Sequence, residues 1–189
     1  MATDVVVSRN TRVIDWGPAI SASVVAGLVF AVIEMALAWA VKGQSPWAPL
    51  HMIGAMGLGP DALAPADTFD LRIVSVAVAI HMALAVLYGV ILALIVQRLN
   101  TAAAVVVGAL YGLALYLINF YGFTWLYPWF ADARDWVSIL SHVVQSGLMV
   151  GLYKAWAESD LVERSDLRRR GDVERPSHDL RHLHARPQI

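Results

Sequence analysis

Four long runs of apolar residues separate the charged parts of this chain, and their length limits the fold more than any other feature. The runs cover about residues 17–41, 71–96, 102–124 and 136–156. A helix needs about 20 apolar residues to cross a bilayer core, and within lipid each backbone N–H and C=O must be paired inside the segment. The sequence therefore predicts an all-α, polytopic membrane protein whose four transmembrane helices form a bundle.

The composition agrees with this fold and excludes several functions. Of the 189 residues, 15% are charged, against about 25% in an ordinary soluble domain. A net charge of −1 gives no surface for nucleic acid. The absence of cysteine excludes a thiolate metal site and a cysteine nucleophile. Nucleotide-binding and hydrolase motifs are missing as well, so we expect no enzyme activity, no cofactor and the lipid bilayer as the partner.

The distribution of basic residues predicts the orientation in the membrane. One side carries Arg9, Arg12, Arg98, Lys154 and Arg164, whereas the other carries Lys42, Arg72 and Arg134. Because Lys and Arg accumulate on the cytoplasmic side, we expect both termini to be cytoplasmic. Residues 1–16 are then a cytoplasmic leader and residues 157–189 a charged cytoplasmic tail, helical in its first half and disordered beyond.

The external segment 43–70 is predicted to contain a helix of its own. Its middle, residues 50–58, is apolar but too short to span a bilayer. We therefore expect an interfacial or half-inserted helix that ends before Pro60. His51 within it is expected to be an interfacial residue rather than a metal ligand.

The stretch Leu115 to Phe130, with the sequence LYLINFYGFTWLYPWF, is rich in Tyr, Trp and Phe. Aromatic rings of this kind gather where a transmembrane helix leaves the bilayer. We expect them to lie at the headgroup level, with Pro128 ending the helix.

The first and third runs share one spacing of two small residues and a polar residue. This set is Ser23, Gly27 and Glu34 in the first run and Gly108, Gly112 and Asn119 in the third. Each set lies on one helix face, because seven residues make about two turns. The pattern predicts two tandem hairpins in the same orientation, a parallel repeat. The alternative is two similar hairpins without shared ancestry.

Small residues also predict how the helices pack. In lipid, helices associate where small side chains let the backbones approach closely. Such pairs are Ser23 with Gly27, Gly108 with Gly112, and Gly147 with Gly151. A pair that the bundle does not use would favour self-association into a homo-oligomer or a larger membrane complex.

Five polar residues lie in the outer half of the predicted spans: Glu34, His81, Asn119, His142 and Gln145. Burying a charge in a membrane costs about 3 kcal/mol or more, so these residues should face one another. One interpretation is a structural hydrogen-bond network in which Glu34 is protonated or paired with an imidazole. The others are proton or cation conduction through the Glu/His cluster, and a haem or metal ion held by the two His in a redox protein.

A second group of histidines lies in the charged tail, at His178, His182 and His184. The first two would share one face of a helix. Metal capture by this short His-rich tract is a further hypothesis.

The stretch NFYGFTWLYPWF, followed by a His-bearing last run, resembles a family of uncharacterised four-span bacterial inner-membrane proteins. The external SPWAPLHMIGAMGLGPDAL is similar to the same family, and the Pro-Trp turn is more loosely similar to YagU-like proteins. The resemblance implies a location in the bacterial inner membrane and no established catalytic residues. Some members are labelled as symporters, but this chain lacks the two multi-span halves of such transporters. We expect a non-enzymatic accessory, transport or stress-related membrane component.

Overall fold

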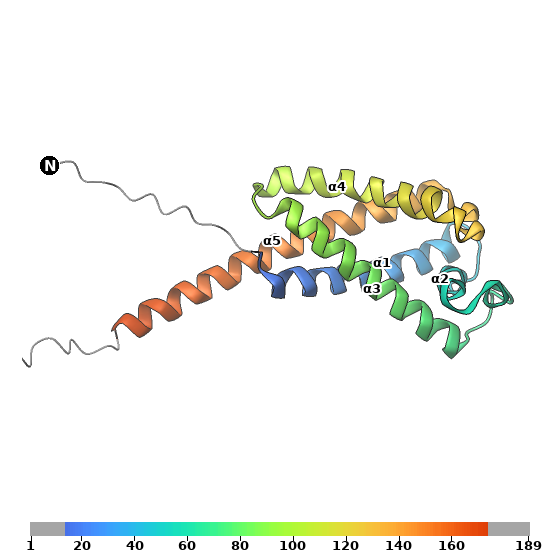
Figure 1. The fold of residues 1–189 in the computed structure, drawn as a ribbon, viewed down its shortest axis with the longest axis horizontal. Helices are drawn as coiled ribbons and strands as arrows, with labels where there is room; N and C mark the ends of the chain where they lie inside the picture. Colours follow the sequence, from blue (N-terminus) through green and yellow to red (C-terminus); the bar gives the residue numbers. More distant parts are fainter. Residues whose placement is uncertain (1–13, 174–189) are drawn as a thin grey trace, which may run out of the picture. The chain divides into compact units, whose positions relative to one another are not determined.

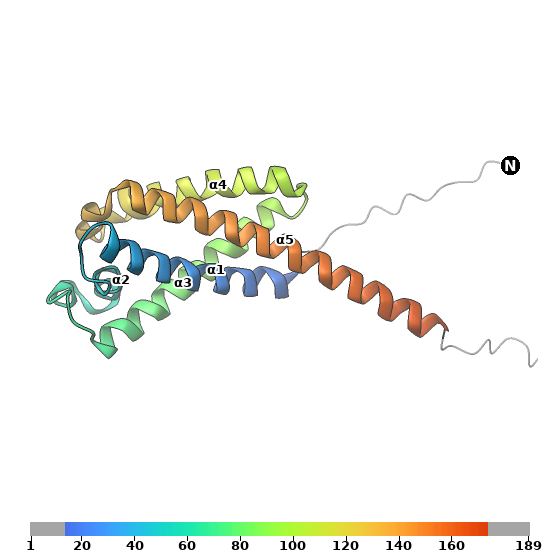
Figure 2. The same cartoon turned by 180° about the vertical axis from the view of Figure 1, so that it is seen from behind.

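The computed structural model describes residues 14–173, and it divides the chain after Lys154 into a helical bundle and a second unit. Helices make up the regular structure of these residues, and no strand occurs among them. Four helices are long and apolar enough to span a membrane: Trp16–Ala40, Leu71–Val96, Thr101–Trp125 and Trp136–Leu167. The chain is thus a multi-pass membrane protein, and the predicted all-α helical bundle is confirmed (Figures 1 and 2).

The helices follow the order that the apolar runs predict. The α-helices are α1 (Trp16–Ala40), α2 (Ala48–Leu58), α3 (Leu71–Val96), α4 (Thr101–Leu117) and α5 (Trp136–Val173). The short elements are 3-10 turns at Pro60–Leu63, Phe123–Trp125 and Pro128–Ala133 and a π-helical turn at Ile118–Gly122. The first three spans begin and end within one residue of the prediction, whereas α5 continues beyond the predicted end at residue 156.

Helices α1 and α3 approach each other closely at small residues. A Cβ added to Gly27 would lie 2.7 Å from Cβ of Ala85, and one added to Gly89 would overlap Ser23. Side chains larger than these would push the two backbones apart. Ser23 and Gly27 therefore form the packing face that their spacing predicts.

Helices α4 and α5 pack in the same way. A Cβ added to Gly108 would lie 2.8 Å from Cγ2 of Val150, and one added to Gly112 would overlap the carbonyl oxygen of His142. Each small pair thus contacts the second helix of its own hairpin. This arrangement is the one expected of two tandem hairpins.

The prediction for Gly147 and Gly151 is wrong within the described part of the chain. No heavy atom lies within 4 Å of a Cβ built on either glycine, and Gly151 is exposed. At these two positions α5 has no close neighbour among the described residues. Sequence spacing shows that a helix has a small-residue face but not which neighbour covers it.

The external helix α2 packs on the start of α3. A Cβ on Gly54 would lie 2.7 Å from Cγ2 of Ile73. His51 is only 1% exposed, and its two ring nitrogens face the carbonyl oxygens of Ala62 at 2.7 Å and Thr68 at 3.0 Å. His51 is therefore buried instead of exposed at an interface, because it ties the loop after α2 back to α2 itself.

The aromatic stretch from Leu115 to Phe130 is divided between the inside and the outside of the bundle. Tyr116, Phe120 and Phe130 form a buried cluster, whereas Tyr121 and Trp125 are exposed. The α-helix already ends at Leu117, and Pro128 begins a 3-10 turn instead of ending the helix. The buried rings pack against each other and against Met52 and Met56 of α2, and the expected position of the stretch at the headgroup level stays a prediction.

Two hydrogen bonds hold this aromatic turn in place. Nε1 of Trp129 donates to the carbonyl oxygen of Met52 at 3.0 Å, which joins the turn to α2. Nε of Arg134 donates to the carbonyl oxygen of Phe120 at 2.7 Å. Trp125 is 85% exposed and keeps the position expected of an interfacial ring.

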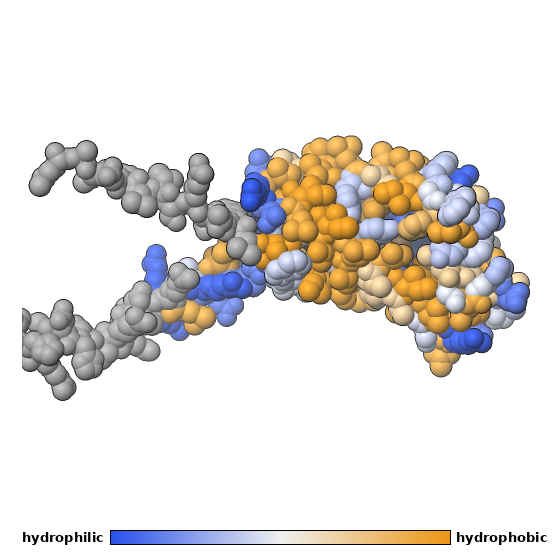
Figure 3. All heavy atoms as spheres, in the orientation of Figure 1, coloured by the Kyte–Doolittle hydropathy of each residue, from blue (hydrophilic) through white to orange (hydrophobic). Residues whose placement is uncertain are grey.

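Large apolar side chains cover the outside of the bundle and small ones fill its inside. The buried residues include Ala19, Ala22, Ala26, Ala38, Ala77, Ala93 and Ala104, whereas the exposed ones include Leu28, Val32, Leu110, Leu117, Leu140 and Val144. Figure 3 shows apolar residues over most of the visible face of the helices, and more polar residues at the end that holds α2. This distribution suits helices that contact lipid on one side and neighbouring backbones on the other.

The second unit comprises the residues from Ala155 onward, of which 155–173 are helical. The helical first half that we predicted for the tail is present. Leu161, Val162 and Leu167 in it are exposed. The hypothetical metal ligands His178, His182 and His184 lie outside the described residues.

Replacing Gly112 by Ala tests the close contact between α4 and α5. The added methyl group would overlap a backbone oxygen, so we expect a loss of about 1–3 kcal/mol in the free energy of unfolding. Gly17→Ala is the matched control, because open space surrounds Gly17 and Ala favours a helix by up to about 1 kcal/mol. Reversible unfolding in detergent measures the free energy of unfolding of both variants. Equal stability of the two would contradict the close contact.

Candidate functional site

A cavity of about 370 Å³ lies in the half of the bundle that carries α2 and the aromatic turn. Its walls include the five residues of the predicted polar cluster: Glu34, His81, Asn119, His142 and Gln145. The tertiary structure thus brings together residues from α1, α3, α5 and the turn after α4, as the sequence predicted.

Most of the cavity wall is apolar, with many aromatic and methionine side chains. These are Phe30, Met52, Met56, Tyr88, Phe120, Phe123, Trp129 and Phe130. Gln44 and Asp132 also line the cavity and are exposed. The cavity therefore reaches the surface at the end of the bundle where the external segment and the aromatic turn lie.

A chain of hydrogen bonds crosses one wall of the cavity. The Tyr88 hydroxyl donates to Oδ1 of Asn119 at 3.5 Å, and Nδ2 of Asn119 donates to Nε2 of His142 at 3.2 Å. Nδ1 of His142 donates to the carbonyl oxygen of Ser138 at 2.8 Å. With one nitrogen donating and the other accepting, the ring is the neutral Nδ1–H tautomer.

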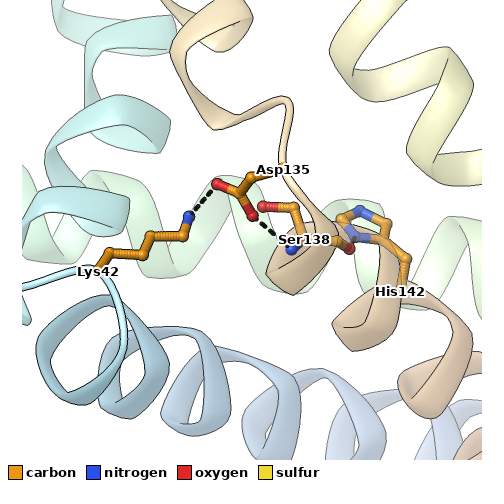
Figure 4. A network of polar contacts seen from close by, with 4 residues as sticks. All are labelled: Lys42, Asp135, Ser138 and His142. Atoms are coloured by element: carbon orange, nitrogen blue, oxygen red, sulfur yellow. Dashed lines mark hydrogen bonds and ion pairs between the residues drawn. The ribbon is translucent and has the colours of Figure 1, made fainter.

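The chain continues to an ion pair at the end of α1. Figure 4 shows Asp135 accepting from the backbone N–H of Ser138 at 3.0 Å and pairing with Lys42 at 2.6 Å. Lys42 follows α1 and Asp135 precedes α5, so the pair joins the two hairpins. The positive charge of Lys42, which also lines the cavity, is thereby matched by the carboxylate of Asp135.

His81 has one ring nitrogen that no described residue engages. Its Nε2 donates to the carbonyl oxygen of Gly27 at 2.9 Å, which fixes the Nε2–H tautomer. Phe30 stacks on the ring with centroids 5.5 Å apart and an interplanar angle of 15°. Among residues 14–173, Nδ1 makes no hydrogen bond, and it keeps a lone pair.

Glu34 is 9% exposed and lines the cavity. Oε1 of Glu34 and Oγ of Ser141 are both buried and make no well-formed hydrogen bond in the described part of the chain. The Ser141 side chain nevertheless acts on the carboxyl group as a hydrogen-bond partner, and Lys42 acts on it through its charge. Neither imidazole bonds to Glu34, so of the two alternatives predicted for this residue the pairing with His is wrong and the protonated carboxyl group remains. An unpaired buried carboxylate costs several kcal/mol, which makes this oxygen the least satisfied polar atom of the wall.

A second, much smaller cavity continues the first toward the middle of the bundle. It has a volume of about 20 Å³, shares Tyr88 and Gln145 with the larger cavity, and adds Ser23 and Tyr111. This volume holds about one water molecule. Leu92, Val96 and Val150, each at most 1% exposed, fill the bundle beyond it.

The two intramembrane His are poorly suited to hold a haem or a metal ion together. Both nitrogens of His142 are used, one by Asn119 and one by Ser138. Among the described residues, no three His, Asp or Glu side chains are grouped to bind a metal. The geometry thus argues against the haem and metal interpretation of this pair.

Sequence reasoning assigned no role in the site to four of its residues: Lys42, Tyr88, Ser138 and Asp135. Lys42 was counted only among the basic residues of one side, although a lysine and an aspartate at the outer ends of two spans were a signal for an ion pair. The sequence signal for the Tyr88 hydroxyl was weaker. It consisted only of the position of Tyr88 two turns after His81 on the same helix face. The sequence held no signal for the carbonyl group of Ser138, because every residue has a carbonyl group.

No protein-family model matches this chain, and no curated protein or solved structure matches it. The resemblance of the 119–130 stretch to four-span bacterial proteins therefore stays a prediction. The cavity and its polar groups are the features that bear on function.

Asn119→Leu tests whether the hydrogen-bond chain holds the helices together. The change removes the partners of Tyr88 and His142, and hydrogen bonds between membrane helices contribute about 0.6 kcal/mol on average and up to about 1.7. We expect unfolding in detergent to show a loss of about 1 kcal/mol. The control is Gln145→Leu, since that amide bonds to no described residue. A loss as large in the control would contradict a specific role for Asn119.

Proposed function

We propose that this protein is a non-enzymatic component of the bacterial inner membrane that binds a small, largely apolar ligand in the cavity. The cavity itself carries the proposal. Its volume of about 370 Å³ lies within the roughly 300–1,000 Å³ of small-molecule sites. Such sites combine mostly apolar and aromatic walls with a few polar groups, and this wall has the same composition.

The bonding of the polar groups supports a binding role rather than catalysis. His142 uses both ring nitrogens, and Lys42 is paired with Asp135. General acid–base catalysis needs a group that can exchange a proton with the substrate. Most titratable groups of this wall are instead held in fixed bonds, which preserve the shape of the cavity.

Proton or cation conduction has less support from the geometry. A conducting path needs polar groups or water along the whole bundle. Leu92, Val96 and Val150 close the half beyond the small cavity with apolar side chains. The cavity is therefore better suited to hold a ligand that enters from one side than to pass one through.

The orientation that we propose puts the mouth of the cavity on the periplasmic side. The excess of Lys and Arg around the other end of the bundle supports cytoplasmic termini. Exposed Gln44 and Asp132 line the mouth. The protein would thus take its ligand from the periplasm or the outer leaflet, which fits an accessory, transport or stress-related role.

We also propose that self-association, if it occurs in the membrane, uses the face of α5 that carries Gly147 and Gly151. This small-residue face has open space around it in the described structure. Close helix contacts in lipid form at such faces.

A cavity-filling variant tests ligand binding. In Ala31→Trp the new ring enters the cavity that Ala31 lines. In a thermal-shift screen of small apolar compounds, we expect hits to stabilise the wild-type protein and to lose their effect in this variant. A ligand at about 100 times its Kd stabilises a protein by about 2.7 kcal/mol.

Val32→Trp is the matched control for this screen. Val32 is the next residue of α1 and is 65% exposed, so its replacement adds the same ring on the outside of the bundle. The control should keep the ligand response of the wild-type protein. Hits that stabilise Ala31→Trp as well as the wild-type protein, or a screen without any hit, would contradict the proposal.

Single cysteines test the orientation, since the chain has none of its own. Exposed positions at the two ends are Gln44 and Ser165. In spheroplasts we expect a membrane-impermeant maleimide to label Gln44→Cys at once and Ser165→Cys only after permeabilisation. The reverse pattern would place the cavity mouth in the cytoplasm.

A further inference from the structure

We propose that the ligand of the cavity carries an ammonium group that pairs with Glu34. This inference rests on the proposed binding function and names the chemical class of the ligand. Its basis is the combination of a buried, unpartnered carboxyl oxygen with an aromatic wall around it.

Besides the amide of Gln145, which can both donate and accept, the unsatisfied groups of the cavity wall include two hydrogen-bond acceptors. Oε1 of Glu34 and Nδ1 of His81 have no partner among residues 14–173, and an imidazole nitrogen without a proton can only accept. Both residues line the cavity. A protonated amine supplies up to three N–H donors and a charge, which are what these acceptors lack.

No cation of the described wall is bonded to Glu34, and Lys42 acts on it only from a distance. Lys42 is the lysine that lines the cavity, and its ammonium group lies 2.6 Å from Asp135. A buried carboxylate gains most from a partner that enters the same low-dielectric space. An ammonium ligand would fill this role.

The aromatic side chains suit the same group. Phe30 stacks on His81 and meets the edge of His142 at 5.0 Å between centroids, which holds its ring beside the polar wall. Tyr88 and Trp129 also line the cavity. Aromatic faces attract cations by about 0.5–2 kcal/mol, more when water is excluded, and they accept the apolar body of the ligand as well.

Other ligand classes fit less well. An anion would meet the carboxylates of Glu34 and Asp132, which both line the cavity. A divalent metal ion prefers several oxygen or imidazole ligands, and the described residues offer no group of three. A neutral apolar molecule would leave Oε1 of Glu34 unpartnered.

Three probes with one tail and different charges test the inference: phenylbutylamine, phenylbutanol and phenylbutyrate. Titration calorimetry of the wild-type protein in zwitterionic nanodiscs, with empty discs subtracted, measures each Kd. We expect the amine to bind about tenfold more tightly than the alcohol, as a gain of about 1.4 kcal/mol from the ion pair implies. The carboxylate should bind most weakly.

Glu34→Gln removes the charge and keeps the shape of the side chain. In this variant we expect the amine to lose its advantage while the Kd of the alcohol stays unchanged. Asp132→Asn is the matched control, because it removes an exposed carboxylate of the same cavity, and it should keep the preference for the amine.

The outcomes separate the two proposals. If amine and alcohol bind the wild-type protein equally, or if Glu34→Gln keeps the preference, the cavity binds small molecules but the assignment of an ammonium ligand is wrong. If none of the three probes binds, both the assignment and the proposed function are overturned. The comparison of probes on the wild-type protein does not depend on the folding of any variant.

Discussion

Close contact between helix backbones is the constraint on which the rest of this structure depends. Water does not drive helices together inside a bilayer, so they associate where side chains are small enough for the backbones to touch. Ser23 and Gly27 provide this contact with α3, and Gly108 and Gly112 provide it with α5. Larger residues follow each pair of small residues along the chain, for example Phe30 and Glu34 on α1. These larger residues line the cavity.

The polar groups of the cavity divide into two kinds. Tyr88, Asn119, His142, Asp135 and Lys42 belong to a chain of hydrogen bonds and an ion pair that joins both hairpins. This chain satisfies its members and stiffens the wall. Glu34 and Nδ1 of His81 stand outside it, although they face the same space. A polar group that the fold leaves without a hydrogen bond is where a ligand gains most, which is why the proposals concern these two residues.

Several mistaken expectations have one physical cause. The pattern of a single helix shows which residues share a face, but the same pattern fits several neighbours. Gly147 and Gly151 form a good packing face that no described residue covers. His51 was placed at the surface, and two carbonyl oxygens of a folded loop surround it instead.

Sequence alone determined the number of spans, the limits of the first three, and five polar residues that share the cavity, because lipid demands long apolar helices and makes isolated polar residues face inward. It also determined the packing faces of α1 and α4. The tertiary structure decided how the polar groups are paired: Asn119 bonds to His142, Lys42 to Asp135, and Glu34 to neither imidazole. Hydrogen bonds depend on differences of a few tenths of an ångström between separate helices, and such distances are set only when the whole bundle is assembled.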